Sequence, residues 1–446
     1  MMHRFGRTPD WISTAAGAMT ALLAPVAFAQ PTAPEPPPPV EPWYEALDLG
    51  VFADAYASLN FNLPKRAENA NQLRAYDTAT GFALAWAGAD VAYEPDPVGG
   101  ALSLRFGPAA ERYSQSCLGG DGARCDGDVL GLGLVKQAFA SWQPLSALRL
   151  DLGKFDTPFG VEVAESQDSL LYSRGVVYWL GEPAFHTGLR ATLTMTPWLT
   201  ARAMVVNGWN NTIDNNAGKT YGAQFLLAPA RDLRLALGWL GGPEQTDYAT
   251  VTCAADTAYD PRNGACWPEP GAPGGEVVVD RGGANDLEAW RHLLNLVATW
   301  QPVKRLELTL DGVFGQEGVR EERAVGAGPG PDGSLIVALS PTEVNERYFG
   351  AALAARCALT DVWAVAGRGE YFADPDGLAS GIGGLGLVTA TLGLEFDPTP
   401  ALKLRLEGRG DLVTDADGSR EIFAAGARAD ESSQLTTTLS AVVRTF

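Results

Sequence analysis

Charged side chains of both signs are concentrated between Leu148 and Glu182, and they are of the kinds that could control which solutes pass a pore. A pore selects by its width and by the charged groups at its narrowest point. Within this stretch the candidate constriction residues are Lys154, Asp156, Glu162, Glu165, Asp168 and Arg174. Further basic candidates occupy the polar faces of neighbouring strand-like segments: Arg149, Arg190, Arg202 and Arg234. An acidic loop opposite a basic wall would create a transverse field, whereas the alternative is that these arginines are solvated charges at a rim.

The stretch between Phe155 and Glu182 is predicted to be a long loop that folds into the interior of the molecule. It lies between two strand-like segments and combines its charges with an apolar cluster, Val176–Trp179. A loop that stood in solvent would not need this cluster, because large exposed apolar patches are uncommon on protein surfaces. The alternative is an external cap that packs on its neighbours.

Four of the five cysteines fall in two polar loops, and each loop is predicted to contain one disulfide. The pairs are Cys117 with Cys125 and Cys253 with Cys266, and each bond would staple a long loop of an exported protein. Neither pair has the C-x2-C spacing of a zinc site and no histidine lies nearby, so a metal site is the weaker interpretation. Cys357 lies in a strand-like segment and is expected to be a small wall residue.

No catalytic site and no cofactor are expected from the other residues that could carry chemistry. His186 and His292 sit in strand-like segments without a G-x-S-x-G motif, so both are predicted to be structural. A barrel enzyme acting on lipid is the alternative, and it would place one histidine within hydrogen-bonding reach of a serine. The G-x-G-x-x-G match at 381–386 precedes a strand instead of opening a helix, so it does not predict nucleotide binding.

Segments of alternating polarity must position all these residues. In the first of them Leu49 and Val51 share one face, while Asp54 and Tyr56 share the other, as expected for a strand. The pattern recurs in 16 segments, joined by seven tight turns that alternate with eight longer loops, two of which are polar loops over 241–288 and about 315–345. The predicted fold is therefore an all-β, transmembrane, antiparallel up-and-down barrel of about 16 strands, with short periplasmic turns and long extracellular loops.

A sandwich would not alternate short and long connections so regularly. Closure also has a physical reason, because in lipid every backbone N–H and C=O must be paired within the protein and only a closed sheet has no open edges. Sixteen strands enclose a lumen too wide for wall side chains alone to fill, so a water-filled passage is expected.

The N-terminal segments and the charge constrain location and partners. Residues 1–29 combine a basic start, an apolar run and the A-x-A site Ala27–Ala29, which predicts a cleaved signal peptide. The proline-rich residues 30–46 are predicted to be a periplasmic spacer, and 47–446 the outer-membrane barrel. No later run reaches the roughly 18 consecutive apolar residues that a membrane helix needs. The formal net charge of -20 argues against nucleic acid as a partner.

Several short motifs follow one another in a moderately specific order: Ala53-Asp54-Ala55-Tyr56, Gly153-Lys154-Phe155, Tyr172-Ser173-Arg174, His186-Thr187-Gly188, Asn207-Gly208-Trp209 and Asp214-Asn215-Asn216. Together they resemble the β-barrel porins of the OmpL-like type over most of the mature chain, with more departures in the C-terminal half. The resemblance implies an outer-membrane diffusion channel of Gram-negative bacteria, which contacts membrane lipid and passes small hydrophilic solutes or ions. By analogy with other 16-stranded porins, a homotrimer is one assembly to expect. The alternative is a structural or adhesive barrel with a plugged lumen and partner-binding loops.

Overall fold

The computed structural model describes residues 46–65, 70–94, 96–114, 132–245, 248–260, 265–280, 289–329 and 335–445. The predicted signal peptide and almost all of the predicted spacer lie outside these residues, as do Cys117 and Cys125. Within the described ranges no helix is long and apolar enough to cross a membrane.

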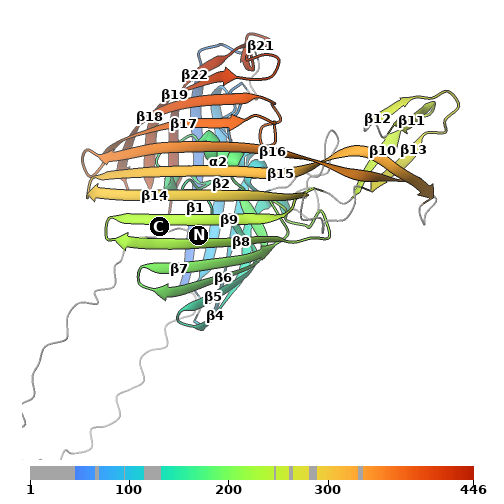
Figure 1. Ribbon diagram of the computed structural model, residues 1–446. Helices are drawn as coiled ribbons and strands as arrows, with labels where there is room; N and C mark the ends of the chain where they lie inside the picture. Colours follow the sequence, from blue (N-terminus) through green and yellow to red (C-terminus); the bar gives the residue numbers. More distant parts are fainter. Residues whose placement is uncertain are drawn as a thin grey trace, which may run out of the picture.

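Sixteen strands among the described residues form one closed antiparallel barrel, as the sequence predicted (Figure 1). Each strand pairs with the next along the chain, and the last pairs with the first, from Phe52↔Arg444 to Asn60↔Thr436. Closure leaves the barrel without an open edge. The barrel strands are β1 (Leu47–Asn60), β2 (Gly81–Tyr93), β3 (Val98–Phe106), β4 (Val135–Leu145), β5 (Leu148–Asp156), β6 (Phe185–Thr196), β7 (Leu199–Val206), β8 (Thr220–Ala230), β9 (Leu233–Pro243), β14 (Trp290–Val303), β15 (Leu306–Pro329), β16 (Leu335–Ala358), β17 (Trp363–Asp374), β18 (Leu385–Thr399), β19 (Leu402–Asp415) and β22 (Ser433–Arg444).

The two faces of the strands differ as the alternation predicts. In β1 the outward Leu49 and Val51 are 57% and 52% exposed, whereas the inward Asp54 is completely buried. On β18 the outward Leu392 is 73% exposed. An apolar outer wall of this kind is stable against lipid and unfavourable against water. Trp363 and Phe396 stack with their ring centroids 4.3 Å apart beside the short turns, where an interfacial aromatic girdle is expected.

The short connections are tighter than predicted, because the strands continue into them. β4 ends at Leu145 and β5 begins at Leu148, and β18 ends at Thr399 while β19 begins at Leu402. These connections gather at one rim of the barrel, which we call the turn rim.

Two regions predicted as polar loops contain strands instead. β15 and β16 remain paired from Leu306↔Cys357 out to Pro329↔Leu335, so the predicted loop over 315–345 is largely a continuous hairpin. In the predicted loop over 241–288, β10 (Tyr248–Cys253) pairs with β13 (Gly275–Asp280), and β13 runs parallel to the first four residues of β16. Short β-branched runs such as Val277–Val279 favour strands. The Gly and Pro residues around them are typical of loops, and for this reason the sequence predicted a loop. Figure 1 shows this arm projecting beyond the barrel wall.

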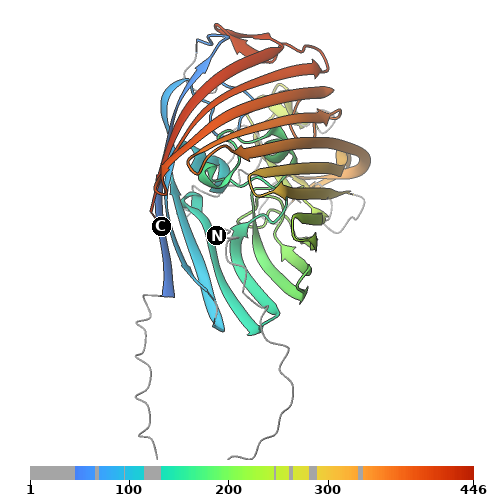
Figure 2. The same cartoon turned by 90° about the vertical axis from the view of Figure 1, so that its left-hand side faces the viewer.

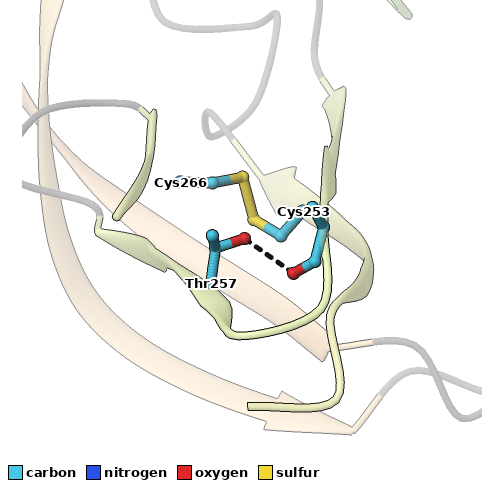
Figure 3. Close-up of a disulfide and its surroundings, with 4 residues drawn as sticks. Cys253, Thr257 and Cys266 are labelled. Carbon is cyan, nitrogen blue, oxygen red and sulfur yellow. Dashed lines mark hydrogen bonds between the residues drawn. A yellow bond between two sulfur atoms is a disulfide. The ribbon is translucent and has the colours of Figure 1, made fainter. Parts of the chain in front are cut away.

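One disulfide fixes the arm. Cys253 at the end of β10 is bonded to Cys266 in β12 (Ala265–Pro268), which pairs with β11 (Thr257–Asp260). Figure 3 shows the bond beside Thr257, whose hydroxyl donates a hydrogen bond to the carbonyl of Ala254 at 2.7 Å. Cys253 and Cys266 are thus the pair of cysteines that the structure joins in the arm.

Other connections run inside the barrel, and Figure 2 shows helical turns within the curved wall. Helix α2 (Val176–Gly181), preceded by the short helix η4 (Ser166–Asp168), lies between β5 and β6. The hydroxyl of Tyr348 on β16 donates a hydrogen bond to the carbonyl of Gly181 at 2.9 Å, which places α2 against the inner wall. The remaining short elements are α1 (Pro108–Ser114), η3 (Leu132–Leu134), β20 (Phe423–Ala425) and β21 (Arg428–Glu431).

Candidate functional site

Residues 157–184, between β5 and β6, form an inward loop that enters the lumen. Its entry depends on Gly160, whose φ is +77° and whose N–H donates to Asn295 Oδ1 on β14 at 3.1 Å. A Cβ at this position would lie 1.8 Å from Glu182 Oε2 at the other end of the loop. Glycine therefore allows both the left-handed turn and the close approach of the two ends.

Charged residues on β19 bind the main chain of the inward loop. Arg405 donates to the carbonyls of Ser166 and Ser169 at 2.5 and 2.6 Å, and Arg409 donates to the carbonyl of Arg174 at 2.7 Å. Glu407 accepts the N–H of Tyr172 at 2.8 Å. These three wall residues alternate along one strand and so share its inner face. Hydrogen bonds to ionised groups are the stronger kind, so the loop is held firmly in place.

A second anchor comes from β17. Arg368 donates to the carboxylate of Glu162 at 2.5 Å and to the carbonyl of Ser173 at 3.0 Å. Arg368, Glu407 and Arg409 were not among the candidates from the sequence. The sequence signal that could have found Glu407 and Arg409 is the run of charges at every second position of 403–411, which alternates with leucines on the lipid face. That run showed which residues point inward but not what they bind.

The predicted loop residues are engaged in ion pairs or hydrogen bonds. Glu165 lies 2.7 Å from Arg105 and 3.2 Å from Lys136, and Lys136 also lies 2.5 Å from Asp156. Burial alone would raise the pKa of Glu165, but the two cations hold it well below its usual range. Asp168 pairs with Arg444 at 3.1 Å.

Arg174 has a structural position. It is 1% exposed and donates to the carbonyl of Leu171 at 2.8 Å, within its own loop. Its guanidinium also lies 5.9 Å from the ring centroid of Tyr76. It braces the loop and does not line the cavity described below.

The predicted basic wall residues separate into two groups. Arg149 pairs with Glu94 at 3.1 Å beside the turn rim, and Arg190 pairs with Asp151 at 2.8 Å. Lys154 lies over the ring of Phe185, 4.0 Å from its centroid. Arg202 and Arg234 instead line a cavity together with acidic residues.

That cavity, which we call the turn-side cavity, has a volume of about 810 Å³ and opens between the inward loop and the turn rim. Residues of the inward loop from Val161 to Asp168 form one side of it. Its charged lining residues are Asp48, Asp90, Glu94, Asp156, Glu165, Asp168, Arg105, Arg202 and Arg234. Five of the predicted constriction residues therefore meet here, which are Asp156, Glu165, Asp168, Arg202 and Arg234.

At the level of the inward loop, the side chains that face the lumen are closely packed and buried. One buried apolar cluster joins loop residues such as Val177 to Leu240 on β9 and Phe372 on β17, on different parts of the wall. Inward polar residues at this level, such as Lys136 and Arg409, are each 1% exposed. The expected water-filled passage is thus not seen at this level of the described structure. The wall side chains are too short to meet at the centre of the barrel, and the loops occupy that space instead.

Two carboxyl groups meet where the inward loop leaves the wall. Asn295 donates to Glu182 Oε1 at 3.1 Å and to Asp311 Oδ1 at 2.9 Å. Burial raises the pKa of Glu182 well above its usual range, and the nearby Asp311 and Glu162 carboxylates raise it further. No group of three or more His, Cys, Asp and Glu residues within the described ranges is arranged to hold a metal ion.

Both histidines have structural surroundings. The ring nitrogens of His186 lie 3.2 Å from Thr157 Oγ1 and 3.1 Å from the carbonyl of Gly208. His292 stacks on Trp239 with centroids 6.1 Å apart. Neither pattern resembles a serine-histidine-acid site.

The chain is similar to known channel proteins. The family described as "Putative beta-barrel porin-2, OmpL-like" matches residues 46–445. The outer-membrane channel DcaP of Acinetobacter baumannii superposes with a TM-score of 0.52 at 10% identity, over 90% of this chain and 97% of that one. OmpT of Vibrio cholerae superposes with a TM-score of 0.50 at 9% identity, over the same shares of both chains. These identities are low enough that the two structures support the fold alone. No curated protein matches the sequence significantly.

Proposed function

The chain belongs to the family of OmpL-like β-barrel porins, and from this membership we propose that its outer-membrane barrel is a channel for passive diffusion of small hydrophilic solutes or ions. The apolar outer wall suits an integral position in the outer membrane, and the family and the fold are those of channels and not of enzymes.

The observation that carries the proposal is the position of the inward loop. It crosses the lumen and borders the turn-side cavity, so a solute that traverses the barrel must pass it. Five charged residues of both signs lie on this path: Asp156, Glu165, Asp168, Arg202 and Arg234. We propose that they form the selective region, and that passage requires displacement of the loop from the position seen here.

The test is single-channel conductance of the refolded mature chain in a planar bilayer. Discrete open steps are expected, and the reversal potential in a salt gradient reports which sign of charge dominates the pathway. Correctly folded, heat-modifiable protein that never conducts would refute the channel.

A matched pair of variants tests the role of the loop. Glu407→Gln weakens the bonds to Tyr172 and Ser173 and should raise the open probability, because the loop loses a charged anchor. Glu421→Gln changes an exposed acid outside the barrel strands and should leave gating unchanged. Equal open probabilities of the two variants would show that this anchor does not control passage.

A structural or adhesive barrel is the second candidate, and the filled lumen and the projecting arm favour it. In that case the mature chain would be silent in bilayers under all conditions. The arm built from β10–β13 and the ends of β15 and β16 would then carry the function.

Export and assembly are part of the same proposal. An intact mass that corresponds to a chain beginning at Gln30 would support the signal peptide. Light scattering in detergent measures the assembly directly, with three chains expected for the proposed homotrimer and any other number excluding it.

A further inference from the structure

The two halves of the inward loop are held by different kinds of wall residue. The first half, 157–174, is bound by the guanidinium groups of Arg368, Arg405 and Arg409, which donate to its carbonyl oxygens. Arginine stays charged at every ordinary pH, and hydrogen bonds of ionised groups are the stronger kind. This half is therefore anchored over a wide range of pH.

The second half of the loop contains α2 and is held mainly by neutral groups. Tyr348 on β16 donates to the last carbonyl of α2 at 2.9 Å, and Asn210 Oδ1 accepts the N–H of Ala184 at 2.6 Å. Tyr348 and Tyr178 are the tyrosines that interact with Glu182, and tyrosine is neutral below its ordinary pKa of about 10. Because neutral hydrogen bonds are the weaker kind, this half is the part of the loop that a change in one charge can release.

Glu182 lies at the end of this second half, and it faces another carboxyl group. Asn295 on β14 donates to Glu182 Oε1 at 3.1 Å and to Asp311 Oδ1 at 2.9 Å. Glu182 and Asp311 are also hydrogen-bonded to each other, which two carboxyl groups can be only if one of them carries a proton. Asp311 Oδ2 accepts the N–H of Val161 at 2.8 Å, so the pair joins both ends of the loop to the wall.

The other charged groups around Glu182 do not neutralise it. Glu162 in the same loop and Glu370 on β17 are further carboxylates, and Arg368 pairs with these two at 2.5 and 2.8 Å. Glu182 is 4% exposed and forms no ion pair within the described part of the chain. Loss of a proton here would therefore leave a buried negative charge beside the carboxylate of Asp311, which is unfavourable.

We infer that the carboxyl pair of Glu182 and Asp311 is a proton-dependent latch that keeps α2 inside the lumen. With the shared proton in place, α2 stays against β15, β16 and β17. When the proton passes to water, the two carboxylates repel each other and α2 leaves the wall, while the first half of the loop stays anchored. This inference rests on the proposed function, because it names the event that opens that channel, which is a rise in pH.

Hydrogen exchange of the α2 amides measures this release without conduction. In the full mature chain in detergent micelles, the protection of 176–181, corrected for the intrinsic exchange rate, should fall about tenfold per pH unit above about pH 4.3, the pKa of a solvated glutamic acid, and should stop falling at the pKa of the closed state. The N–H groups of Tyr172 and Ser173, in the anchored half, should not show this fall. Protection of 176–181 that is independent of pH would overturn the inference.

Two variants assign the proton to the pair. Glu182→Gln keeps an amide donor toward Asp311 but cannot ionise, so the protection of α2 should not depend on pH. Asp311→Asn keeps an acceptor for the N–H of Val161 and removes the facing charge, so the fall should end at a lower pH. Glu276→Gln changes an exposed acid of β13 in the arm and should behave as the wild type. A wild-type fall in Glu182→Gln, or an unchanged end of the fall in Asp311→Asn, would refute the latch.

Glu244 is a second buried acid near the end of the loop. It accepts the N–H of Trp209 at 2.6 Å, next to the Asn210 that binds Ala184, and burial raises its pKa to about 7. Glu244→Gln should leave the pH dependence of α2 protection in place. If it abolishes that dependence and Glu182→Gln does not, the proton acts at Glu244 and the inference is wrong.

Bilayer recordings separate the latch from the channel. The open probability should rise with pH in the wild type and stay low in Glu182→Gln. Conduction with the same open probability at every pH would refute the latch and leave the channel intact. Release of α2 in a protein that never conducts would refute the channel and leave the latch intact.

Discussion

Gly160 and Glu182 close the two ends of the inward loop against each other, so that a Cβ at position 160 would lie 1.8 Å from Glu182 Oε2. The same contact places Glu182 beside Asp311 and Asn295 of the wall. The loop is thus fixed at its base by a glycine that leaves room for a buried carboxyl group.

Gly160→Ala should destabilise the folded barrel by about 1–3 kcal/mol, because it combines a strained positive φ with the clash against Glu182. The thermal midpoint of heat-modifiability in detergent would measure it. Gly381→Ala is the matched control, since Gly381 has a φ of +74° and nothing within 4 Å of a new Cβ. If the two variants lose equal stability, the contact with Glu182 contributes nothing.

Glu182→Gln should change the pH dependence of stability. The pKa of Glu182 is raised in the folded state, so its contribution is fully present below about pH 4.3 and is lost as the pH rises through the folded pKa. Glutamine does not titrate. The thermal midpoint of the variant minus that of the wild type should therefore increase as the pH rises above about 4.3. A difference that stays constant from acid to alkaline pH would contradict the assignment.

Glu165→Gln should show the opposite slope. Arg105 and Lys136 hold the pKa of Glu165 low, so its contribution is present above about pH 4.3 and is lost as the pH falls through the folded pKa. Near pH 7 the variant removes one of two carboxylate partners from each cation, since Arg105 keeps Asp90 and Lys136 keeps Asp156, and it should lose about 1–3 kcal/mol of unfolding free energy. This deficit, measured by chemical unfolding in detergent, should shrink in acid. An equal deficit at every pH would exclude the ion pairs as its cause.

Leu392→Arg should destabilise the barrel in a bilayer by about 2–4 kcal/mol if the side chain meets the lipid midplane. Leu392 is 73% exposed in β18, and Leu63, at 69% exposed, lies in the connection after β1. Leu63→Arg should therefore be nearly neutral. Unfolding of both variants in lipid vesicles provides the comparison, and equal effects would argue that the outer wall does not face lipid.

The double substitution Cys253→Ser and Cys266→Ser should loosen the arm without unfolding the barrel. The bond spans 13 residues between β10 and β12, away from the barrel strands. Such a crosslink is worth about 3 kcal/mol to the segment it closes. Limited proteolysis should cut the variant within 248–280 while its heat-modifiable mobility stays unchanged. Loss of that mobility would show that the arm supports the barrel.

The strands and their faces could be predicted because their signal is local. Leu49 and Asp54 take opposite faces through the period of two, and no distant residue is needed to decide this. The same rule assigns the alternating charges of β19, such as Arg405, to its inner face. The prediction was wrong at the arm, where short apolar runs such as Val277–Val279 form strands by pairing with residues far along the chain.

The sequence by itself determined the closed barrel, its lipid face and its short turns, since these follow from periodicity and neighbouring residues. Only the tertiary structure decided which wall residues hold the inward loop and which charged side chains line the turn-side cavity. Glu407 binds Tyr172 across 235 positions of sequence, and Arg202 faces the neutral Gln224 across the ladder and donates a hydrogen bond to it. Such pairings depend on which strands closure brings to face the loop, and a pattern along one strand carries no information about the strand opposite.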